Sequence, residues 1–442
     1  MKNKTPLLFI IAALLALLLG VFFGLLASLQ YMIPDFLKEY IPFHKMRPFH
    51  VTTVISWIIL CVTGSIYFFI THIEKFALYS KKLLKIHFVV FMITAIGIYV
   101  SFLSGKMEGR EYLSYTPILT IPILFGWILF GVNYYKTIAK NVKNWPVYYW
   151  MWGTGIVFMI YHLCEAHFWL IPGFRERFIT DMAVQWKSYG SFVGSWNMLV
   201  YGTAIYLMSK IKRDSNLAHG KMVFFFYFLG LTNLMFGWAH HTYIIPTQPW
   251  IRYVAYGVSM TEWIVLAHII YSWIKSLSVK DKQEYCMVYR FLKAADFWVF
   301  INIILALLFS IPTINFFTHG THITVAHSMG TTIGINTTIL MASVFFIAQK
   351  ILPSFKTTTL FIKRSYYLFN IMLFLFFCTL LYAGVLKSNW MYFTKDVHFS
   401  EMQDSLFTAY IAFFVFGLGL AISITTLSLT LIKALLKALK SN

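Results

Sequence analysis

Long apolar runs separated by short polar breaks extend along the whole chain. A helix needs about 20 residues to cross about 30 Å of hydrocarbon. Twelve runs reach that length, near residues 6–32, 48–71, 84–104, 114–135, 146–170, 184–209, 222–245, 250–274, 294–312, 322–349, 365–386 and 405–432. No polar segment is long enough for a separate soluble domain, and no internal repeat is visible. The pattern predicts one all-α membrane bundle of twelve helices over residues 1–442.

The composition agrees with a membrane protein and excludes other classes. Of the 442 residues, 59% are hydrophobic and only 12% are charged. The net charge of +20 comes from Lys and Arg between apolar runs, not from a solvated patch, which argues against a nucleic-acid-binding protein. The four cysteines lack CxxC spacing and predict neither a zinc site nor a disulfide framework. The first apolar run is longer than a signal h-region and lacks an obvious cleavage site, so we expect a membrane helix there.

The basic residues are distributed unequally between alternate loops. With the N-terminus inside, 25 of the 36 Lys and Arg residues fall on the inner side and 11 on the outer side. Positive loops are retained in the cytoplasm. The distribution therefore predicts that both termini are cytoplasmic, as an even number of helices requires.

Six histidines fall at a similar depth in the predicted outer leaflet. They are His50, His162, His167, His240, His241 and His327. Ionisable side chains are costly within a membrane, and neutral imidazole is the commonest metal ligand. A single membrane histidine is more often a hydrogen-bonded packing residue, and we interpret His72, His87, His219 and His268 near the inner face in that way. A ring of histidines from several helices instead indicates capture of a metal or a haem in the bundle.

Three segments carry a resemblance to a known family. They are LQYMIPDFLKEYIPFHKMRPFHVTTVISW (29–57), FGWAHHTYIIPTQPW (236–250) and NFFTHGTHITVAHSMG (315–330). In order and helix position they resemble the haem and metal segments of the large, NorB-like subunit of nitric oxide reductase, in the haem-copper oxidase superfamily. The THGTHxTxAH pattern is the most specific, and RPFH alone is weak. The resemblance implies the twelve-transmembrane-helix bundle of a haem-copper oxidase subunit I. It also implies two b-type haems, one low-spin and one high-spin, and a non-haem iron or copper.

The resemblance assigns haem ligands to the second and tenth predicted helices. His50 would be an axial ligand of the low-spin haem, and Arg47 would pair with a propionate, although an interfacial arginine often only anchors a helix. His327 would be the proximal ligand of the high-spin haem. Residues two apart point to nearly opposite sides of a helix, so positions 327 and 329 can each reach a different haem. Position 329 is Met where the resemblance implies histidine, so Met329 either ligates the low-spin haem or packs.

The second metal would lie at His240 and His241. Adjacent helical side chains diverge by about 100°, so both reach one metal only if the helix loosens there. His162 and Glu165 are three residues apart and share a helical face. This pair would either complete the coordination sphere of an iron or serve as a proton relay or a structural contact.

The sixth predicted helix departs from the family pattern. Tyr189 and Val193 stand where the resemblance implies a histidine and a glutamate that serve the second metal. Tyr189 leaves oxygen chemistry open, although a membrane tyrosine usually packs or anchors. Glu262, in SMTEW, matches a carboxylate of the reductase pocket, where it would relay protons or tune the metal, unless it is only hydrogen-bonded in the bundle. Glu165 and Glu262 are the candidates for a proton route.

By resemblance, this is a respiratory enzyme of the bacterial cytoplasmic (inner) membrane that reduces nitric oxide to nitrous oxide. Electrons would come from a membrane-anchored cytochrome c subunit (NorC-like), because the chain lacks a soluble cytochrome domain and the long N-terminal extension of quinol-using relatives. Dioxygen reduction and NO dismutation on the same scaffold remain alternatives, as does a non-catalytic haem protein for electron transfer or NO sensing. A solute transporter is disfavoured because the histidines cluster away from the midplane.

Overall fold

The computed structural model describes residues 4–140, 142–236, 242–243, 245–394 and 396–441, without the side chains of residues 259, 260, 262, 263 and 441. The long helices are α1 (Thr5–Met32), α2 (Phe43–Phe68), α3 (Lys81–Leu103), α4 (Thr120–Ile138), α5 (Val147–Glu165), α7 (Phe178–Lys212), α8 (Lys221–Phe236), α9 (Pro249–Ser276), α11 (Cys286–Ser310), α14 (Thr338–Ile351), α15 (Leu360–Phe393) and α17 (Phe407–Ser441). The short helices are α6 (Pro172–Arg175), α10 (Val279–Glu284), α12 (Pro312–Thr318), α13 (His322–Met329) and α16 (Phe399–Ser405). Two π-helices, η1 (Phe69–Ile73) and η7 (Gly330–Thr337), extend α2 and join α13 to α14. The described part of the chain forms no strand, so the all-α prediction is confirmed.

Eight segments of the described chain are long and apolar enough to cross a membrane. They contain α1, α2, α3, α4, α11, α13 with α14, α15 and α17. Helices α5, α7, α8 and α9 coincide with the other four predicted runs. Many Tyr, Trp, Ser and Gly residues in α5 and α7 lower their hydropathy. The bundle is therefore confirmed as a membrane fold, and the count of twelve crossings stays a prediction.

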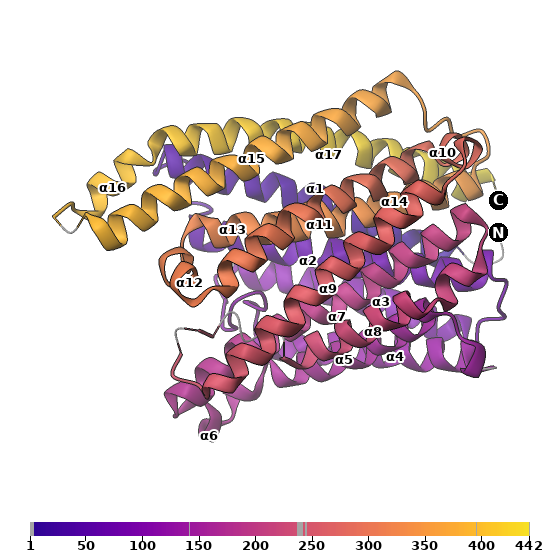
Figure 1. Ribbon diagram of the computed structural model, residues 1–442, viewed down its shortest axis with the longest axis horizontal. Helices are drawn as coiled ribbons and strands as arrows, with labels where there is room; N and C mark the ends of the chain where they lie inside the picture. The colour runs from indigo at the N-terminus through magenta and orange to yellow at the C-terminus, as the bar shows by residue number, and fades with distance from the viewer. Residues whose placement is uncertain (1–3, 141, 237–241, 244, 395, 442) are drawn as a thin grey trace.

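The two termini lie at the same end of the bundle (Figure 1). There the Lys4 ammonium donates a hydrogen bond to the carbonyl of Leu439, at 2.6 Å. We call the end of the bundle that holds the termini the terminal end. The end that carries α6, α12 and α16 is called the opposite end. Termini at one end agree with an even number of crossings. Which end faces the cytoplasm stays a prediction.

The helical segment His322–Ile351 runs through the centre of the bundle, and 89% of its most apolar window is buried. Two side-chain hydrogen bonds join it to α2. The indole of Trp57 donates to Thr337 Oγ1 at 3.1 Å, and Ser343 Oγ donates to Ser65 Oγ at 2.8 Å. Polar contacts of this kind fix the register of two apolar helices, because unpaired polar groups are costly in the core.

A close helix pair, α1 and α2, packs beside this centre. A Cβ added at Gly64 would lie 2.8 Å from side-chain atoms of Phe9 and Ile10. A Cβ at Gly20 would lie 3.0 Å from Val54. Small residues allow the two backbones to approach closely. Helix α1 therefore sets the position of α2, including the turn that contains His50.

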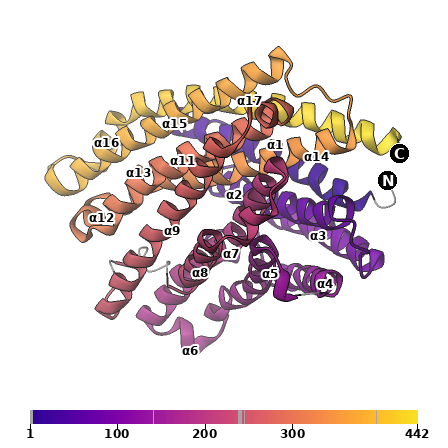
Figure 2. The ribbon, with the colours of Figure 1, turned by 45° about the vertical axis from the view of Figure 1, so that its right-hand side comes forward.

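The remaining helices form the periphery. Helices α15 and α17 lie side by side along one side, next to α1, and α3, α4 and α5 follow one another on another side (Figures 1 and 2). Helix α7 contacts α5 and α8, and α9 lies between α8 and α11. Side-chain caps begin several of these helices, as at Ser80, whose hydroxyl accepts from the Leu83 amide at 3.2 Å. The arrangement brings the starts of α2 and α13 and the end of α5 to the opposite end.

Candidate functional site

The imidazole of His50 is oriented by the backbone of α1. Its Nδ1 lies 2.8 Å from the carbonyl oxygen of Gly20, and because a carbonyl only accepts, Nδ1 carries the proton and donates. The ring fills the space beside Gly24, where an added Cβ would lie 2.9 Å from Nδ1. The neutral ring then presents an Nε2 lone pair, and the described residues give that atom no hydrogen-bond partner. A histidine that donates through one nitrogen and offers the other is the usual form of a metal ligand, so His50 fits a haem iron.

Arg47, one turn before His50, forms an ion pair with Glu111 in the loop between α3 and α4. Both side chains are partly exposed, so this pair contributes little to stability. The guanidinium keeps donors beyond those that Glu111 uses. The binding of a haem propionate by Arg47 therefore remains a proposal.

His327 and Met329 lie in the last turn of α13. Thr321 caps the start of α13, and its hydroxyl accepts from the Ile323 amide at 3.2 Å. The His327 ring meets Phe309 edge-on, with centroids 5.5 Å apart. Both His327 and Met329 are half-buried within a segment that is otherwise almost fully buried. The divergence of these two side chains toward two haems stays a prediction.

The π-helix η7 follows directly after Met329, which the sequence interpretation did not foresee. Its wider turn is accommodated by Gly330, where an added Cβ would lie 2.4 Å from the amide nitrogen of Asn302. π-Helical turns often occur at functional sites. The only sequence signal for it is the run of small residues GTTIGINT.

His162 and Glu165 share a face of α5, as predicted, and form a cluster with Lys187 of α7. The His162 Nδ1 lies 3.0 Å from Glu165 Oε2, and the Lys187 ammonium contacts the same carboxylate. We call these three residues the Glu165 cluster. An ionised carboxylate only accepts, so Nδ1 of His162 donates and Nε2 keeps a lone pair. That Nε2 is buried and has no hydrogen-bond partner among the described residues.

Lys187 is the functional candidate that sequence reasoning missed. Its side chain is 21% exposed and the Glu165 side chain 12% exposed, so two opposite charges are held together in a mostly buried place. The Lys187 ammonium also lies 5.2 Å from the ring centre of Tyr161. A lysine within a predicted membrane helix, at the end of the bundle where Glu165 lies, was the available signal.

The predicted second metal centre lies largely outside the described residues. His240 and His241 are outside them, and so is the side chain of Glu262. Among the described residues, no three His, Cys, Asp or Glu side chains are grouped in a way that would hold a metal ion. His162 is therefore the one predicted metal ligand whose surroundings are visible, and its buried Nε2 lone pair has the chemistry of a ligand.

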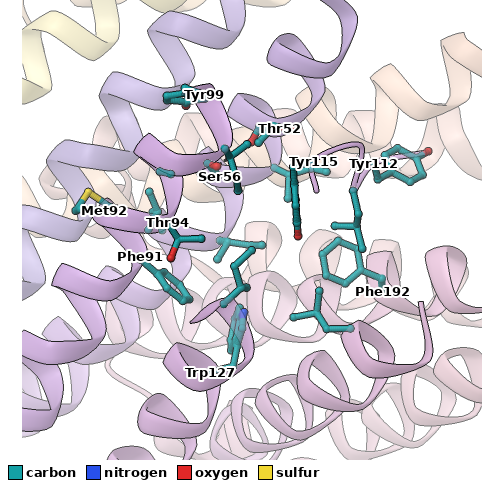
Figure 3. Close-up of a pocket in the computed structure, with 18 residues that line it drawn as sticks. Thr52, Ser56, Phe91, Met92, Thr94, Tyr99, Tyr112, Tyr115, Trp127 and Phe192 are labelled. Carbon is teal, nitrogen blue, oxygen red and sulfur yellow. Dashed lines mark hydrogen bonds between the residues drawn. The ribbon is translucent and has the colours of Figure 1, made fainter. Parts of the chain in front are cut away.

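Tyr189 is buried in α7 and packs against Tyr112 of the α3–α4 loop, with ring centres 5.9 Å apart. Tyr112 lines a cavity of about 90 Å³ between α2, α3 and α4 (Figure 3). Leu163 and Phe192 close the inner side of this cavity, so it ends beside the turns that carry His162 and Tyr189.

The walls of the cavity are mostly apolar. Two buried polar atoms at residues lining it, Thr52 Oγ1 and Trp127 Nε1, have no hydrogen-bond partner among the described residues. Tyr115, another lining residue, has a hydroxyl that accepts from Thr120 Oγ1 at 3.5 Å and can itself donate a hydrogen bond. The cavity suits a small apolar molecule that accepts a hydrogen bond.

Other histidines have structural surroundings. His167 donates from Nδ1 to the Leu163 carbonyl at 2.8 Å and accepts at Nε2 from Thr120 at 2.9 Å, so both nitrogens are satisfied. His219 binds two backbone carbonyls at the terminal end. His319 contacts the ring of Trp186, and burial lowers the pKa of its imidazole. These contacts support the packing interpretation of His219. His167, one of the six outer-leaflet histidines, instead has structural partners at both nitrogens and is not placed as a ligand.

At the terminal end, a second carboxylate is held by α7. Glu74, just after η1, accepts hydrogen bonds at Oε1 from the Tyr206 hydroxyl at 2.8 Å and from the Lys210 ammonium at 2.7 Å. We call these three residues the Glu74 cluster. Sequence reasoning singled out none of them.

Comparison with known proteins places this chain in one family. The family model described as cytochrome c and quinol oxidase polypeptide I matches residues 4–420. The chain belongs to this family. A curated relative, the B subunit of nitric oxide reductase from Stutzerimonas stutzeri, is 24% identical over 345 residues, which cover 72% of this chain and 69% of the relative. A solved structure of a heme-copper terminal oxidase dimer superposes with a TM-score of 0.75 at 15% identity, covering 98% of this chain and 84% of that one.

Membership in the polypeptide I family makes this protein an oxidoreductase with the fold of a haem-copper oxidase subunit I. Members of the family bind haems and a metal. The His50 geometry fits that requirement, because Gly20 fixes the tautomer that offers Nε2. The predicted family is thus confirmed, and the ligand assignments are taken up below.

Proposed function

We propose that this protein reduces two molecules of nitric oxide to nitrous oxide and water, consuming two electrons and two protons. The similarity to the B subunit of nitric oxide reductase supports the choice of substrate. The observation that carries the proposal is the His50 imidazole, held in one tautomer by Gly20 at the end of the bundle where His327 also lies. His50 is thus a specific candidate for the haem ligand that the oxidoreductase family assignment calls for.

We assign His50 and Met329 to a low-spin haem b and His327 to a high-spin haem b. Arg47 would bind a propionate with the donors that Glu111 leaves. His240 and His241 would hold a non-haem iron or copper, and Nε2 of His162 would either complete that coordination or take up a proton. When bound, these groups supply the electrons and the open coordination positions that joining two nitric oxide molecules requires.

The Glu165 cluster supplies a proton route in this proposal. Lys187 keeps the Glu165 carboxylate ionised, and the carboxylate accepts from Nδ1 of His162. Because Nδ1 already carries the proton that it donates to Glu165, His162 takes up a further proton only at Nε2, the buried atom, and the carboxylate stabilises the imidazolium that forms. Because the carboxylate is committed to Lys187 and His162, we assign Glu165 to proton transfer and not to metal binding. Glu262 would extend the route, and Tyr189 would border it.

The cavity between α2, α3 and α4 supplies access for a gas (Figure 3). Its apolar walls suit a small molecule that dissolves in the lipid bilayer. Its inner side reaches Leu163 and Phe192, next to the turns of His162 and Tyr189. The proposal therefore separates the path of the gas from the path of the protons.

The proposal places the protein in the bacterial inner membrane with both termini in the cytoplasm. A membrane-anchored cytochrome c subunit is the proposed electron donor. The name of the curated relative, a lettered subunit of a reductase, supports an enzyme of more than one polypeptide.

The test is gas analysis of the purified, reduced protein under nitric oxide without oxygen, together with iron and haem quantitation. We expect nitrous oxide, two haems and one further iron per chain. The His50→Leu and His327→Leu variants should each lose the absorbance of one haem. The His219→Leu control should leave the spectrum unchanged. Two haems with no nitrous oxide would overturn the proposal.

Dioxygen reduction is the second candidate, favoured by the buried Tyr189 beside Tyr112 and by the oxidases that the family description names. The same preparation with oxygen in place of nitric oxide distinguishes the two. Oxygen uptake that falls when Tyr189 is changed to Phe, without nitrous oxide formation under nitric oxide, would favour this candidate.

A further inference from the structure

The last turns of α17 carry three lysines on their outer face. Lys433, Lys437 and Lys440 are spaced four and three residues apart, which places them on one side of the helix. All three are exposed, whereas Ala434 and Ala438 between them are buried. We call these three lysines the α17 stripe. The stripe concentrates three positive charges on about two turns of one helix at the terminal end of the bundle.

The α17 stripe continues an apolar face of the same helix. Towards the middle of α17, the exposed residues at the same helical spacing are Val415, Leu418, Ile422 and Leu429. Leu436, which is 43% exposed, lies among the lysines, and together they line an open hollow of about 340 Å³. The face therefore changes along its length from apolar to basic, with an apolar side chain inside the basic part. A phospholipid presents its acyl chains and its phosphate in the same order.

The length of α17 and its contact with α1 give the depth of the stripe. The helix has 35 residues, about 52 Å at 1.5 Å per residue, which exceeds about 30 Å of hydrocarbon. The hydrogen bond from Lys4 to the Leu439 carbonyl places Lys440 level with the start of α1. Lys433 lies about 10 Å nearer the middle, and a lysine at such a depth extends its ammonium towards the boundary. The stripe thus lies at the headgroups of the leaflet at the terminal end.

The chain supplies little negative charge to this stripe. No Asp or Glu follows Asp404 in the sequence, and no ion pair reaches Lys433 or Lys440 from the described residues. Other basic side chains at the terminal end do pair with glutamates, as Lys210 and Arg213 show. The carbonyls at the end of a helix attract cations only within its last turn, and Lys433 lies before that turn. The stripe therefore suits an anion from outside the chain.

We propose that the α17 stripe binds the headgroup of an anionic phospholipid. The lysines would bind the phosphate, Leu436 would pack against the glycerol ester region, and the acyl chains would lie along the apolar face of α17. A lipid fits this place better than an acidic protein, because the basic face continues directly into residues that face hydrocarbon. Each lysine close to an anionic headgroup raises the affinity about fivefold.

The first test is photo-crosslinking of the purified full-length protein in nanodiscs that contain equal amounts of phosphatidylglycerol and phosphatidylcholine. A photoreactive analogue of leucine replaces Leu436, and mass spectrometry identifies the crosslinked lipids. We expect phosphatidylglycerol to exceed phosphatidylcholine about tenfold, since more than one lysine contributes. Sodium phosphate in place of sodium chloride at equal ionic strength should leave this ratio unchanged, because free phosphate has no acyl chain. Equal yields of the two lipids would overturn the proposal, and so would a ratio abolished by free phosphate.

The second test changes the charge of the stripe. Lys433→Gln, Lys437→Gln and Lys440→Gln together should lower the lipid ratio to within about twofold of one, because the attraction is electrostatic. Arginine at the same three positions keeps the charge and should keep the ratio within about twofold of the original. The single variant Lys433→Gln should lower the ratio about twofold to fivefold, and it keeps the test decisive if the triple variant folds poorly.

The matched control removes three other exposed lysines of the terminal end, Lys81, Lys82 and Lys85 at the start of α3. Their change to glutamine alters the net charge of the protein by the same amount as the triple change in α17. The ratio of lipids crosslinked at Leu436 should then stay within about twofold of the original. An equal fall in both triple variants would show that only the total charge of this end matters, and it would refute a site on α17.

Discussion

The Glu165 and Glu74 clusters are built alike at opposite ends of the same helix. In each, a lysine of α7 pairs with a mostly buried glutamate from a neighbouring segment, and a third side chain donates to the carboxylate. Lys187 and Lys210 are separated by about 35 Å along α7, close to the thickness of a membrane. Both clusters tie α7 to another helix at a boundary of the bundle.

The third member of each cluster makes the difference. In the Glu74 cluster it is Tyr206, whose single hydroxyl is used by the carboxylate. In the Glu165 cluster it is His162, which has a second ring nitrogen with a lone pair buried in the bundle. The comparison teaches that an ion pair only holds helices together, whereas an added imidazole can pass a proton or bind a metal. We therefore expect the Glu165 cluster to matter for activity and the Glu74 cluster for stability.

The largest effect is expected for His162→Phe, which removes Nε2 and keeps the ring volume. Turnover of nitric oxide should fall on the order of 100-fold, the usual contribution of a positioned acid or base. Nitrous oxide formation by the purified protein measures it. The control is His167→Phe, which removes a histidine of the same helix end whose two nitrogens already have structural partners. Equal losses in both variants would contradict the special role of His162.

Glu165→Gln should lower both activity and stability. It leaves the Lys187 ammonium without its counter-charge in a mostly buried place, which we expect to cost about 3 kcal/mol. Thermal unfolding in detergent measures this change. Adding Lys187→Met should recover most of the stability, because the unpaired charge is gone, but none of the activity. Recovery of turnover in the double variant would show that Glu165 has no part in proton transfer.

Glu74→Gln should lower stability and leave turnover unchanged within about twofold. The Lys210 partner is 31% exposed, so water screens part of the loss, and we expect about 1–2 kcal/mol. The same unfolding assay and gas assay apply. A loss of turnover as large as that of Glu165→Gln would abolish the distinction between the two clusters.

The smallest effect is expected for Tyr206→Phe, which removes one hydroxyl and keeps the ring packed on Phe69. Loss of its hydrogen bond to Glu74 should cost about 1 kcal/mol. A double-mutant cycle with Glu74→Gln should give a coupling energy of similar size. Additive effects would mean that the Tyr206 and Glu74 contact contributes nothing of its own.

The apolar runs predicted the positions of the long helices well, because hydrophobic length is set by the bilayer and not by tertiary contacts. Helices α5 and α7 show the limit of that signal. Their Tyr, Trp, Ser and charged residues lower the hydropathy, so hydropathy alone does not separate them from soluble helices. The π-helix η7 was not predictable, since it depends on how Gly330 packs against Asn302.

The candidate site was predictable where it follows helical geometry. His162 and Glu165 are three residues apart, and their contact follows from the pitch of α5. The partners supplied by distant segments were not predictable: Lys187 for Glu165, Glu111 for Arg47 and Gly20 for His50. Each of these contacts depends on which helices are neighbours in the bundle. The spacing of residues along one helix does not show which helices those are.

The carbonyl of Gly20 has a consequence for biosynthesis. Until α1 lies against α2, the His50 ring is free to rotate and to exchange its proton between the two nitrogens. Helices α1 and α2 precede the other described helices along the chain, so their pairing would prepare the ring to accept the proposed haem iron before those helices are made. We expect the capacity to load this haem to be determined early in membrane insertion, by the seam between the first two crossings.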